Sequence, residues 1–351
     1  MARPTSRNDF RIAIVCALPC EYNAVSLLID EFWDEDGDPY RRAEGDPNIY
    51  VTGRIGETNV VLVRLPEMGK GSAAGAAASL RSSFPRLEAA FLTGICGGVP
   101  RSGSEEILLG DVILSKTVVQ YDLGRQYPGE FVTKDTVEAS LGRPAKHIRT
   151  LVAAYETDLL RGRLEKRTSA LLEKLQHMAA ERSLSKYQYP GVEHDKLFPA
   201  DYPHKHQAPA QCSICANPNM TCEQSKQLSC DSLECDSTNL IERKRLQRAR
   251  KNEEHSTPLA PAIFVGRIGS GDTVMKSGED RDRIAAMHSL LAFEMEGAGI
   301  WDEIPCITVK AVCDYTDSHK NKRWQDYAAA TAPSAMKALL EHYPKTDNQG
   351  M

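Results

Sequence analysis

The chain has 351 residues, of which 41% are hydrophobic and 26% are charged, and its formal net charge is −5. This composition is typical of a soluble globular protein that buries a sizeable core. The negative charge gives no general attraction to nucleic acid or to an anionic membrane, so neither is expected as a partner. No apolar run approaches the roughly 20 residues that span a bilayer, and the first ten residues lack the apolar core of a signal peptide. We therefore expect a cytoplasmic protein with reduced cysteines.

The first ordered elements follow a polar start, residues 1–9, that we expect to be disordered. An apolar run at residues 11–18 has the length of a strand, and the helical spacing of apolar residues over 19–32 predicts a helix. Glu21 therefore lies in the turn after the strand or in the first helical turn. In an α/β sheet this position faces the crevice, although an acid there is equally expected simply to complement the helix dipole.

Glycines mark the turns that follow. Residues 49–65 predict two strands, and the sequence MGKGSAA then leads into an alanine-rich helix. Lys70 and its flanking glycines would suit an anion, but close helix–sheet packing explains these glycines equally well. The strand at residues 88–99 runs into Gly94 and Gly97, which place bare backbone beside the crevice or simply form a tight turn.

The second half of the chain contains an insertion. Residues 144–187 predict charged helices, and residues 186–258 are richer in proline, histidine and cysteine, with a basic run at 243–251. We expect this run to be a solvated face or a contact for phosphate-rich partners. Strand and helix patterns return from residue 263. The alternation predicts a single α/β domain over residues 10–345, with helices on both faces of a sheet.

Five cysteines of the insertion lie between residues 212 and 235. Cys212 and Cys215 have the Cys-x-x-Cys spacing that lets two thiolates hold one ion, and with Cys222 and His204 they are candidate ligands of a structural zinc ion. The remaining gaps match no standard zinc ribbon or finger, so reduced cysteines in a flexible loop are the alternative. No cofactor is expected for catalysis.

Three carboxylates, Glu21, Glu296 and Asp314, each lie where a predicted strand ends. Such positions converge on one crevice of an α/β sheet. A set of carboxylates can cleave a glycosidic bond, with one acid protonating the leaving group and another activating water or holding the sugar hydroxyls. On position alone, ordinary capping or salt-bridging acids are the favoured interpretation.

The order of motifs resembles the nucleoside phosphorylase and nucleosidase superfamily. The motifs cover about residues 10–132 and 263–343 and read ALPCE, MGKGSAA, TGICGG, LLGDVILS, GSGDTVM, FEMEGAG and VKAVCDYTDS. The superfamily includes 5′-methylthioadenosine/S-adenosylhomocysteine nucleosidase and the purine and uridine nucleoside phosphorylases. The chain is especially similar to fungal modules that occur alone or at the amino terminus of larger immune-receptor-like proteins. The resemblance implies one α/β domain around a twisted mixed sheet that partly closes into a barrel.

The resemblance also implies roles for individual residues. Asp314 matches the acid that protonates or hydrogen-bonds the purine N7, and Glu296 matches the carboxylate that holds the ribose 2′- and 3′-hydroxyls. Met295 matches the methionine beneath the sugar, and Glu21 matches the glutamate that activates water. The other predicted substrate-binding residues are Phe293, Glu294, Gly94, Gly97, Val274 and Met275.

The predicted reaction is hydrolysis, because the first loop presents Glu21 and lacks an arginine that would hold phosphate. The chain carries Ile95 and Cys313 where the bacterial nucleosidases carry serines, which argues against a 5′-methylthio preference. We expect a purine ribonucleoside as substrate, adenosine before inosine or guanosine. The alternatives are a phosphorylase that holds phosphate with Lys70 and the loop glycines, and a non-catalytic nucleoside-sensing or assembly module. The resemblance implies a homodimer, since relatives complete their pockets with a neighbouring subunit.

Overall fold

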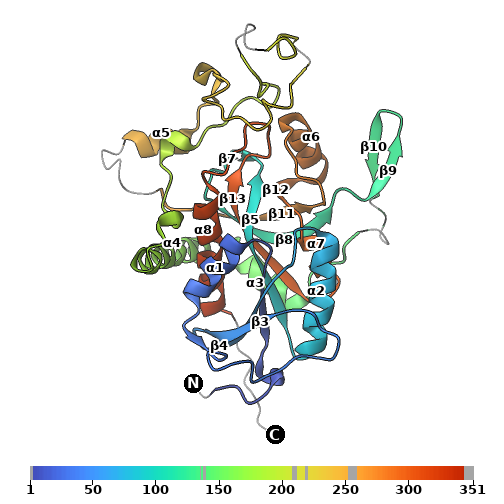
Figure 1. Cartoon of the computed structure of the whole chain (residues 1–351), viewed down its shortest axis with the longest axis vertical. Helices are drawn as coiled ribbons and strands as arrows, with labels where there is room; N and C mark the ends of the chain where they lie inside the picture. The colour runs from blue at the N-terminus through green and yellow to red at the C-terminus, as the bar shows by residue number, and fades with distance from the viewer. Residues whose placement is uncertain are drawn as a thin grey trace.

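A computed structural model describes residues 3–134, 136, 140–207, 212–217, 220–251 and 259–343, and it places a mixed sheet between two layers of helices (Figure 1). The strands of the main sheet are β1 (Ile12–Cys16), β2 (Glu31–Phe32), β3 (Tyr50–Ile55), β4 (Thr58–Arg64), β5 (Ala89–Gly98), β8 (Val112–Gln120), β11 (Ile263–Ser270), β12 (Leu290–Glu294) and β13 (Cys306–Asp314). Two small ribbons pair β6 (Arg101–Ser102) with β7 (Glu105–Glu106) and β9 (Gly124–Tyr127) with β10 (Glu130–Thr133). The helices are α1 (Pro19–Leu28), α2 (Lys70–Ser83), α3 (Lys146–Ala154), α4 (Asp158–Glu181), α5 (Lys244–Lys251), α6 (Gly278–His288), α7 (Gly297–Trp301) and α8 (Gln325–Glu341).

The main sheet closes partly into a barrel. Its strand order is β12-β11-β8-β13-β5-β1-β4-β3-β2, and β12 also pairs with β5, which closes a ring of five strands. Most neighbours are parallel, including β1 with β5 and β5 with β13, whereas β8 with β13 and β5 with β12 are antiparallel. The predicted single α/β domain with a mixed, partly closed sheet is thereby confirmed.

Central strands are buried on both faces, as their nearly continuous apolar sequences require. In β1 the side chains of Ile12 and Ile14 join one apolar cluster, and those of Ala13 and Val15 join the cluster on the opposite face. Helices α1, α4 and α8 cover the first face, and α2 and α7 cover the second (Figure 1). Because helices pack on both faces, the ends of the central strands are held in fixed relative positions.

The elements at both ends of the chain are close to those expected. The expected helix after the first strand begins at Pro19, so Glu21 lies in its first turn. Residues 3–9, assigned to a disordered start, contain a short 3-10 helix at Arg7–Asp9, while residues 1 and 2 lie outside the described part. Among the described residues, no helix combines the length and the apolar character that crossing a membrane demands.

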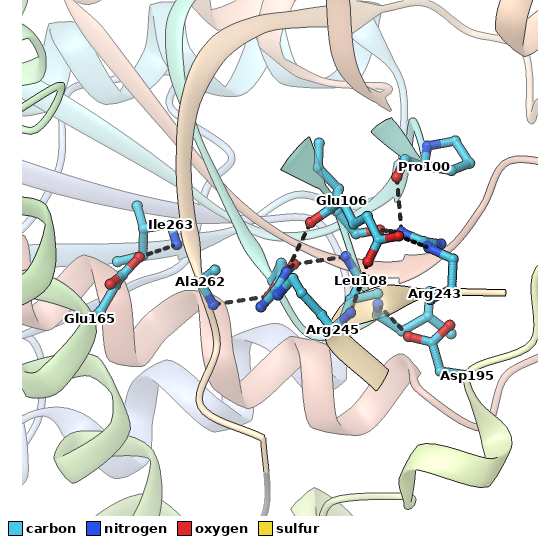
Figure 2. A network of polar contacts seen from close by, with 12 residues as sticks. Pro100, Glu106, Leu108, Glu165, Asp195, Arg243, Arg245, Ala262 and Ile263 are labelled. Carbon is cyan, nitrogen blue, oxygen red and sulfur yellow. Dashed lines mark hydrogen bonds and ion pairs between the residues drawn. The ribbon is translucent and has the colours of Figure 1, made fainter. Parts of the chain in front are cut away.

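Two arginines anchor the insertion to the sheet (Figure 2). Buried Arg243 donates hydrogen bonds to the carbonyl oxygens of Pro100 at 2.9 Å and Ile107 at 2.6 Å. Arg245 pairs with the buried carboxylate of Asp111, and its backbone N–H donates to Glu106 at 2.9 Å. The expectation of a solvated basic run was wrong for these two residues, because a desolvated guanidinium needs acceptors and the β7–β8 region supplies them.

Candidate functional site

One cavity of about 470 Å³ lies where strands β1, β5, β12 and β13 end. The carboxylates of Glu21, Glu294, Glu296 and Asp314 all line it. These residues come from opposite ends of the chain, and the parallel pairing of β1, β5 and β13 brings them to the same edge of the sheet. The convergence expected for Glu21, Glu296 and Asp314 is therefore present in the structure.

Glu21 is held in place by backbone amides. Its Oε2 accepts hydrogen bonds from the N–H groups of Ala17 at 2.9 Å and Leu18 at 2.8 Å, and its Oε1 accepts one from Ile95 at 2.8 Å. A side chain at Gly94 would place its Cβ 2.1 Å from Oε1, so this glycine makes room for the carboxylate. Burial raises the pKa of Glu21, although the Lys310 ammonium and the backbone donors at Leu18 and Ile95 oppose that shift.

Two glutamates at the end of β12, Glu294 within the strand and Glu296 just after it, have different roles. Both oxygens of Glu294 accept backbone hydrogen bonds from the turn that opens α7, from Glu296 N–H at 3.0 Å and from Gly297 N–H at 2.9 and 3.0 Å. Glu294 thus shapes the turn that positions Glu296. The Oε2 of Glu296 accepts a hydrogen bond from Lys310 at 2.9 Å. Among the described residues no hydrogen bond uses its Oε1, which is available for a ligand hydroxyl.

Lys310 is a residue of this site that sequence reasoning missed. It is 1% exposed, and its Nζ lies 2.9 Å from Glu296 and 3.7 Å from Glu294. Burial disfavours its charged form, but the carboxylates of Glu296, Glu294 and Glu21 outweigh that effect and raise its pKa. A lysine inside the otherwise apolar strand ITVKAVC was the available signal, since a buried ammonium requires carboxylate partners.

Asp314 is aimed into the cavity by an irregularity in β13. Val312 pairs with Cys96 and Asp314 with the next residue of β5, Gly97, so Cys313 is an extra residue opposite β5. Oδ1 of Asp314 accepts the Thr316 N–H at 2.9 Å, and Lys320 Nζ lies 3.2 Å from Oδ2. A Cβ on Gly97 would lie 3.0 Å from Oδ1 of Asp314 and 2.4 Å from Thr316 Oγ1, so glycine is needed there.

Comparison with known proteins agrees with this fold. The sequence model described as "Phosphorylase superfamily" matches residues 11–183. This part of the chain is similar to that superfamily. A nucleotide-binding leucine-rich repeat (NLR)-like protein of Hyaloscypha variabilis is 29% identical over 338 residues, which are 95% of this chain and 29% of that protein. The chain therefore spans less than a third of this relative, in line with the expected similarity to modules of larger fungal proteins.

Solved structures of similar fold include two kinds of bacterial hydrolase. The 5′-methylthioadenosine/S-adenosylhomocysteine nucleosidase of Neisseria meningitidis, in complex with methylthio-immucillin-A, has a TM-score of 0.53 and 14% identity, with 95% of this chain and 99% of that chain covered. Futalosine hydrolase of Helicobacter pylori has a TM-score of 0.53 and 13% identity, with 95% and 98% covered. At these identities the likeness shows a shared fold and nothing finer.

Most of the remaining residues predicted to contact a ligand line the same cavity. Gly97, Val274, Met275, Phe293 and Met295 all line it. Gly94 does not line the cavity and instead lies beside the Glu21 carboxylate. In this structure it leaves space for that carboxylate and does not face the ligand site. Phe293 packs edge to face against Tyr121, with ring centroids 5.4 Å apart, which fixes one wall of the cavity.

Lys70 lies outside the lining of this cavity. Its ammonium pairs with Asp122 and lies 3.5 Å from Asp272, whose other oxygen accepts the Lys70 backbone N–H at 2.9 Å. The glycine-flanked turn therefore does receive an anion, but this anion is a carboxylate of the chain itself.

The cysteine-rich segment forms a cluster with a different histidine from the one expected. Cys212, Cys215 and Cys222 gather with His206, and their ligand atoms all lie within 4.8 Å of one another. His204 was the wrong partner, because its ring lies beside Cys230, Cys235 and His319 instead. The spacing of the cysteines could not distinguish two histidines separated by one residue. A structural zinc ion on these three cysteines remains a prediction, now with His206 as the fourth ligand.

Proposed function

We propose that the chain is a purine nucleosidase that hydrolyses the N-glycosidic bond of a purine ribonucleoside, preferably adenosine, to free base and ribose. The observation that carries this proposal is the convergence of Glu21, Glu296 and Asp314 on one cavity. The cavity is within the range of about 300–1,000 Å³ typical of small-molecule sites. Inosine and guanosine are the next candidates.

Each carboxylate has a separate task in the proposed reaction. The free oxygen of Glu296 accepts hydrogen bonds from the ribose hydroxyls, while Met295 packs beneath the sugar. Asp314 protonates the purine N7, so that the base leaves as a neutral group from an oxocarbenium-like transition state. Glu21 removes a proton from the water that attacks the anomeric carbon.

Water is favoured over phosphate by the Glu21 carboxylate and by the pairing of Lys310 and Lys70, although Lys276, Lys320 and Lys322 also line the cavity. Lys310 is already neutralised by Glu296 and Glu294, and Lys70 pairs with Asp122 and Asp272. A phosphate dianion needs cationic or amide donors that are not committed elsewhere. The carboxylate of Glu21 would also repel a phosphate beside it.

Purified protein is therefore expected to release adenine and ribose from adenosine in phosphate-free buffer. Both products are quantified by chromatography, and ribose 1-phosphate is sought in a parallel reaction with added phosphate. Turnover that depends strictly on phosphate would replace the hydrolase with the phosphorylase. Absence of turnover with adenosine, inosine and guanosine in both buffers would support the nucleoside-sensing module.

The variant Lys70→Ala extends this experiment. Because Lys70 does not line the cavity, its loss is expected to change the hydrolytic rate by less than about threefold, in line with the modest free energy of most partly exposed ion pairs. If Lys70 held phosphate, the variant would instead lose most of a phosphate-dependent activity. Rates in the two buffers thus show whether Lys70 binds phosphate and whether water or phosphate is the nucleophile.

The proposed enzyme is a homodimer in which a neighbouring subunit completes the cavity. Met68 and Val274 line the cavity, yet each is 48% exposed in the single chain, as expected for apolar side chains at an unfinished wall. Light scattering after size-exclusion chromatography is expected to give twice the mass of the chain. A fully active monomer would contradict the proposal.

A further inference from the structure

A second group of four metal-binding side chains lies beside the first. His204, Cys230, Cys235 and His319 have ligand atoms that all lie within 4.8 Å of one another. Three of them belong to the insertion, whereas His319 belongs to the segment that follows β13 and Asp314. This group therefore connects the insertion to a segment that lies 115 positions after His204 and 89 positions after Cys230.

The spacing within the second group matches a tetrahedral zinc ion. The two histidine Nδ1 atoms are 3.2 Å apart, and Cys230 Sγ lies 3.8 Å from His204 Nδ1 and 3.6 Å from His319 Nδ1. Cys235 Sγ lies 3.8 Å from His204 Nδ1. With zinc about 2.0–2.1 Å from nitrogen and about 2.3 Å from sulfur, tetrahedral geometry separates two nitrogens by roughly 3.3 Å and a nitrogen from a sulfur by roughly 3.6 Å.

Both histidines are oriented as metal ligands by their outer nitrogens. Nε2 of His204 lies 3.0 Å from the carbonyl oxygen of Leu228, and Nε2 of His319 lies 3.0 Å from that of Tyr202. A carbonyl can only accept, so each Nε2 carries a proton, and a ring with no second proton presents its Nδ1 lone pair to the other ring. Two buried lone pairs at this distance repel each other unless a cation lies between them. A carbonyl behind the outer nitrogen is also the usual support of a zinc-bound histidine.

His319 is fixed by packing as well. Its ring stacks on Phe198 with centroids 4.2 Å apart, and Phe198 stacks in turn on Tyr202 at 5.1 Å. Both histidines are buried, and the structure gives all of the chain's cysteines as free thiols, so the sulfurs of Cys230 and Cys235 are available as ligands.

The residue after His319 reaches the candidate active site. Lys320 Nζ lies 3.2 Å from Oδ2 of Asp314, and Lys320, Asn321 and Lys322 line the cavity. The His319 N–H donates to Asp317 Oδ1 at 2.9 Å, which stiffens the turn between them. An ion held by His319 therefore restrains the segment that presents these three residues to the cavity.

We propose that the insertion binds two zinc ions, one on His206, Cys212, Cys215 and Cys222 and one on His204, Cys230, Cys235 and His319, and that the second ion fixes the Lys320 segment at the rim of the cavity. Two thiolates balance the charge of the second ion, which suits its buried position. The proposal concerns metal content and local order, so its failure would leave the proposed nucleosidase activity untouched.

The test compares two variants that each remove one thiolate from a different cluster, Cys230→Ser and Cys222→Ser. Full-length protein purified without added zinc is analysed by native mass spectrometry and elemental analysis. We expect two zinc equivalents in the parent protein and one in each variant. When Co²⁺ replaces zinc, both ions should give thiolate-to-metal charge-transfer absorption. Cys222→Ser should weaken the absorption of the ion bound with His206, and Cys230→Ser that of the ion bound with His204.

Hydrogen exchange then tests the coupling to the cavity. Amides of residues 318–323 should exchange faster in Cys230→Ser than in the parent, and remain unchanged in Cys222→Ser. If a variant fails to fold, graded chelation of the parent protein provides the same comparison, because loss of the second ion should coincide with faster exchange in this segment. The proposal is overturned if the parent protein holds fewer than two zinc equivalents or if the unreduced protein contains a Cys230–Cys235 disulfide. It is also overturned if the exchange rate of residues 318–323 does not change when the second ion is removed.

Discussion

Replacing Asp314 by asparagine is expected to lower the kcat for adenosine hydrolysis by at least about a hundredfold, the usual contribution of a general acid. Asparagine has nearly the same shape and can still accept the Thr316 N–H that holds Oδ1 at 2.9 Å. It cannot give a proton to the purine N7, so the base has to leave as an anion. Steady-state rates of the variant and the parent protein, measured at one pH, give the ratio.

A second substrate separates proton transfer from mere loss of shape. A purine ribonucleoside methylated at N7 already carries the positive charge that Asp314 would supply, so Asp314→Asn should lose far less activity with it. The matched control is Asp158→Asn, which makes the same chemical change at a carboxylate that is 95% exposed on α4. An equal loss with both substrates would remove N7 protonation from the role of Asp314, and a near-normal rate with adenosine would remove the residue from the mechanism.

The ends of the strands are the part of the site that the sequence predicts well. Glu21, Glu296 and Asp314 each follow an apolar run, and parallel strands necessarily bring such positions to one edge. Helix and strand periodicity is local, so these positions can be found without knowing the strand order. The order itself, including the β5–β12 pairing that closes the barrel, depends on contacts between distant segments and was not predicted. Only the partial closure into a barrel was expected, through the resemblance to a family.

Residues whose roles depend on contacts with distant segments could not be predicted from the local sequence pattern. Lys310 acquires its role from carboxylates on other elements, and the extra residue at Cys313 exists only relative to the register of β5. His319 is a comparable case in the insertion's second cluster. It lies 89 positions after Cys230, which no motif of fixed spacing would connect. Arg243 and Arg245 were likewise expected to be solvated, because their acceptors lie on segments more than a hundred residues earlier in the chain.

Glu21→Gln is expected to lower the kcat for adenosine hydrolysis by at least about a hundredfold, because glutamine cannot take a proton from the attacking water. This change also affects stability. Both oxygens of Glu21 accept backbone N–H groups, so the amide nitrogen of glutamine faces at least one donor and leaves it unsatisfied, at a cost of about 1–3 kcal/mol. The rate is therefore compared at a temperature where thermal unfolding shows both proteins to be fully folded.

The pH profile and the methylated substrate distinguish a base from a structural carboxylate at position 21. Burial raises the pKa of Glu21, and a base acts only when it is ionised, so the parent's rate should fall as the pH drops through a value above that of an ordinary glutamate. This acidic limb should be missing from the residual activity of Glu21→Gln. The N7-methylated nucleoside still needs an attacking water, so the loss in Glu21→Gln should persist with it while the loss in Asp314→Asn shrinks. If both variants instead recover together on that substrate, Glu21 supports departure of the base rather than activation of water, and the preference for hydrolysis over phosphorolysis loses its main argument.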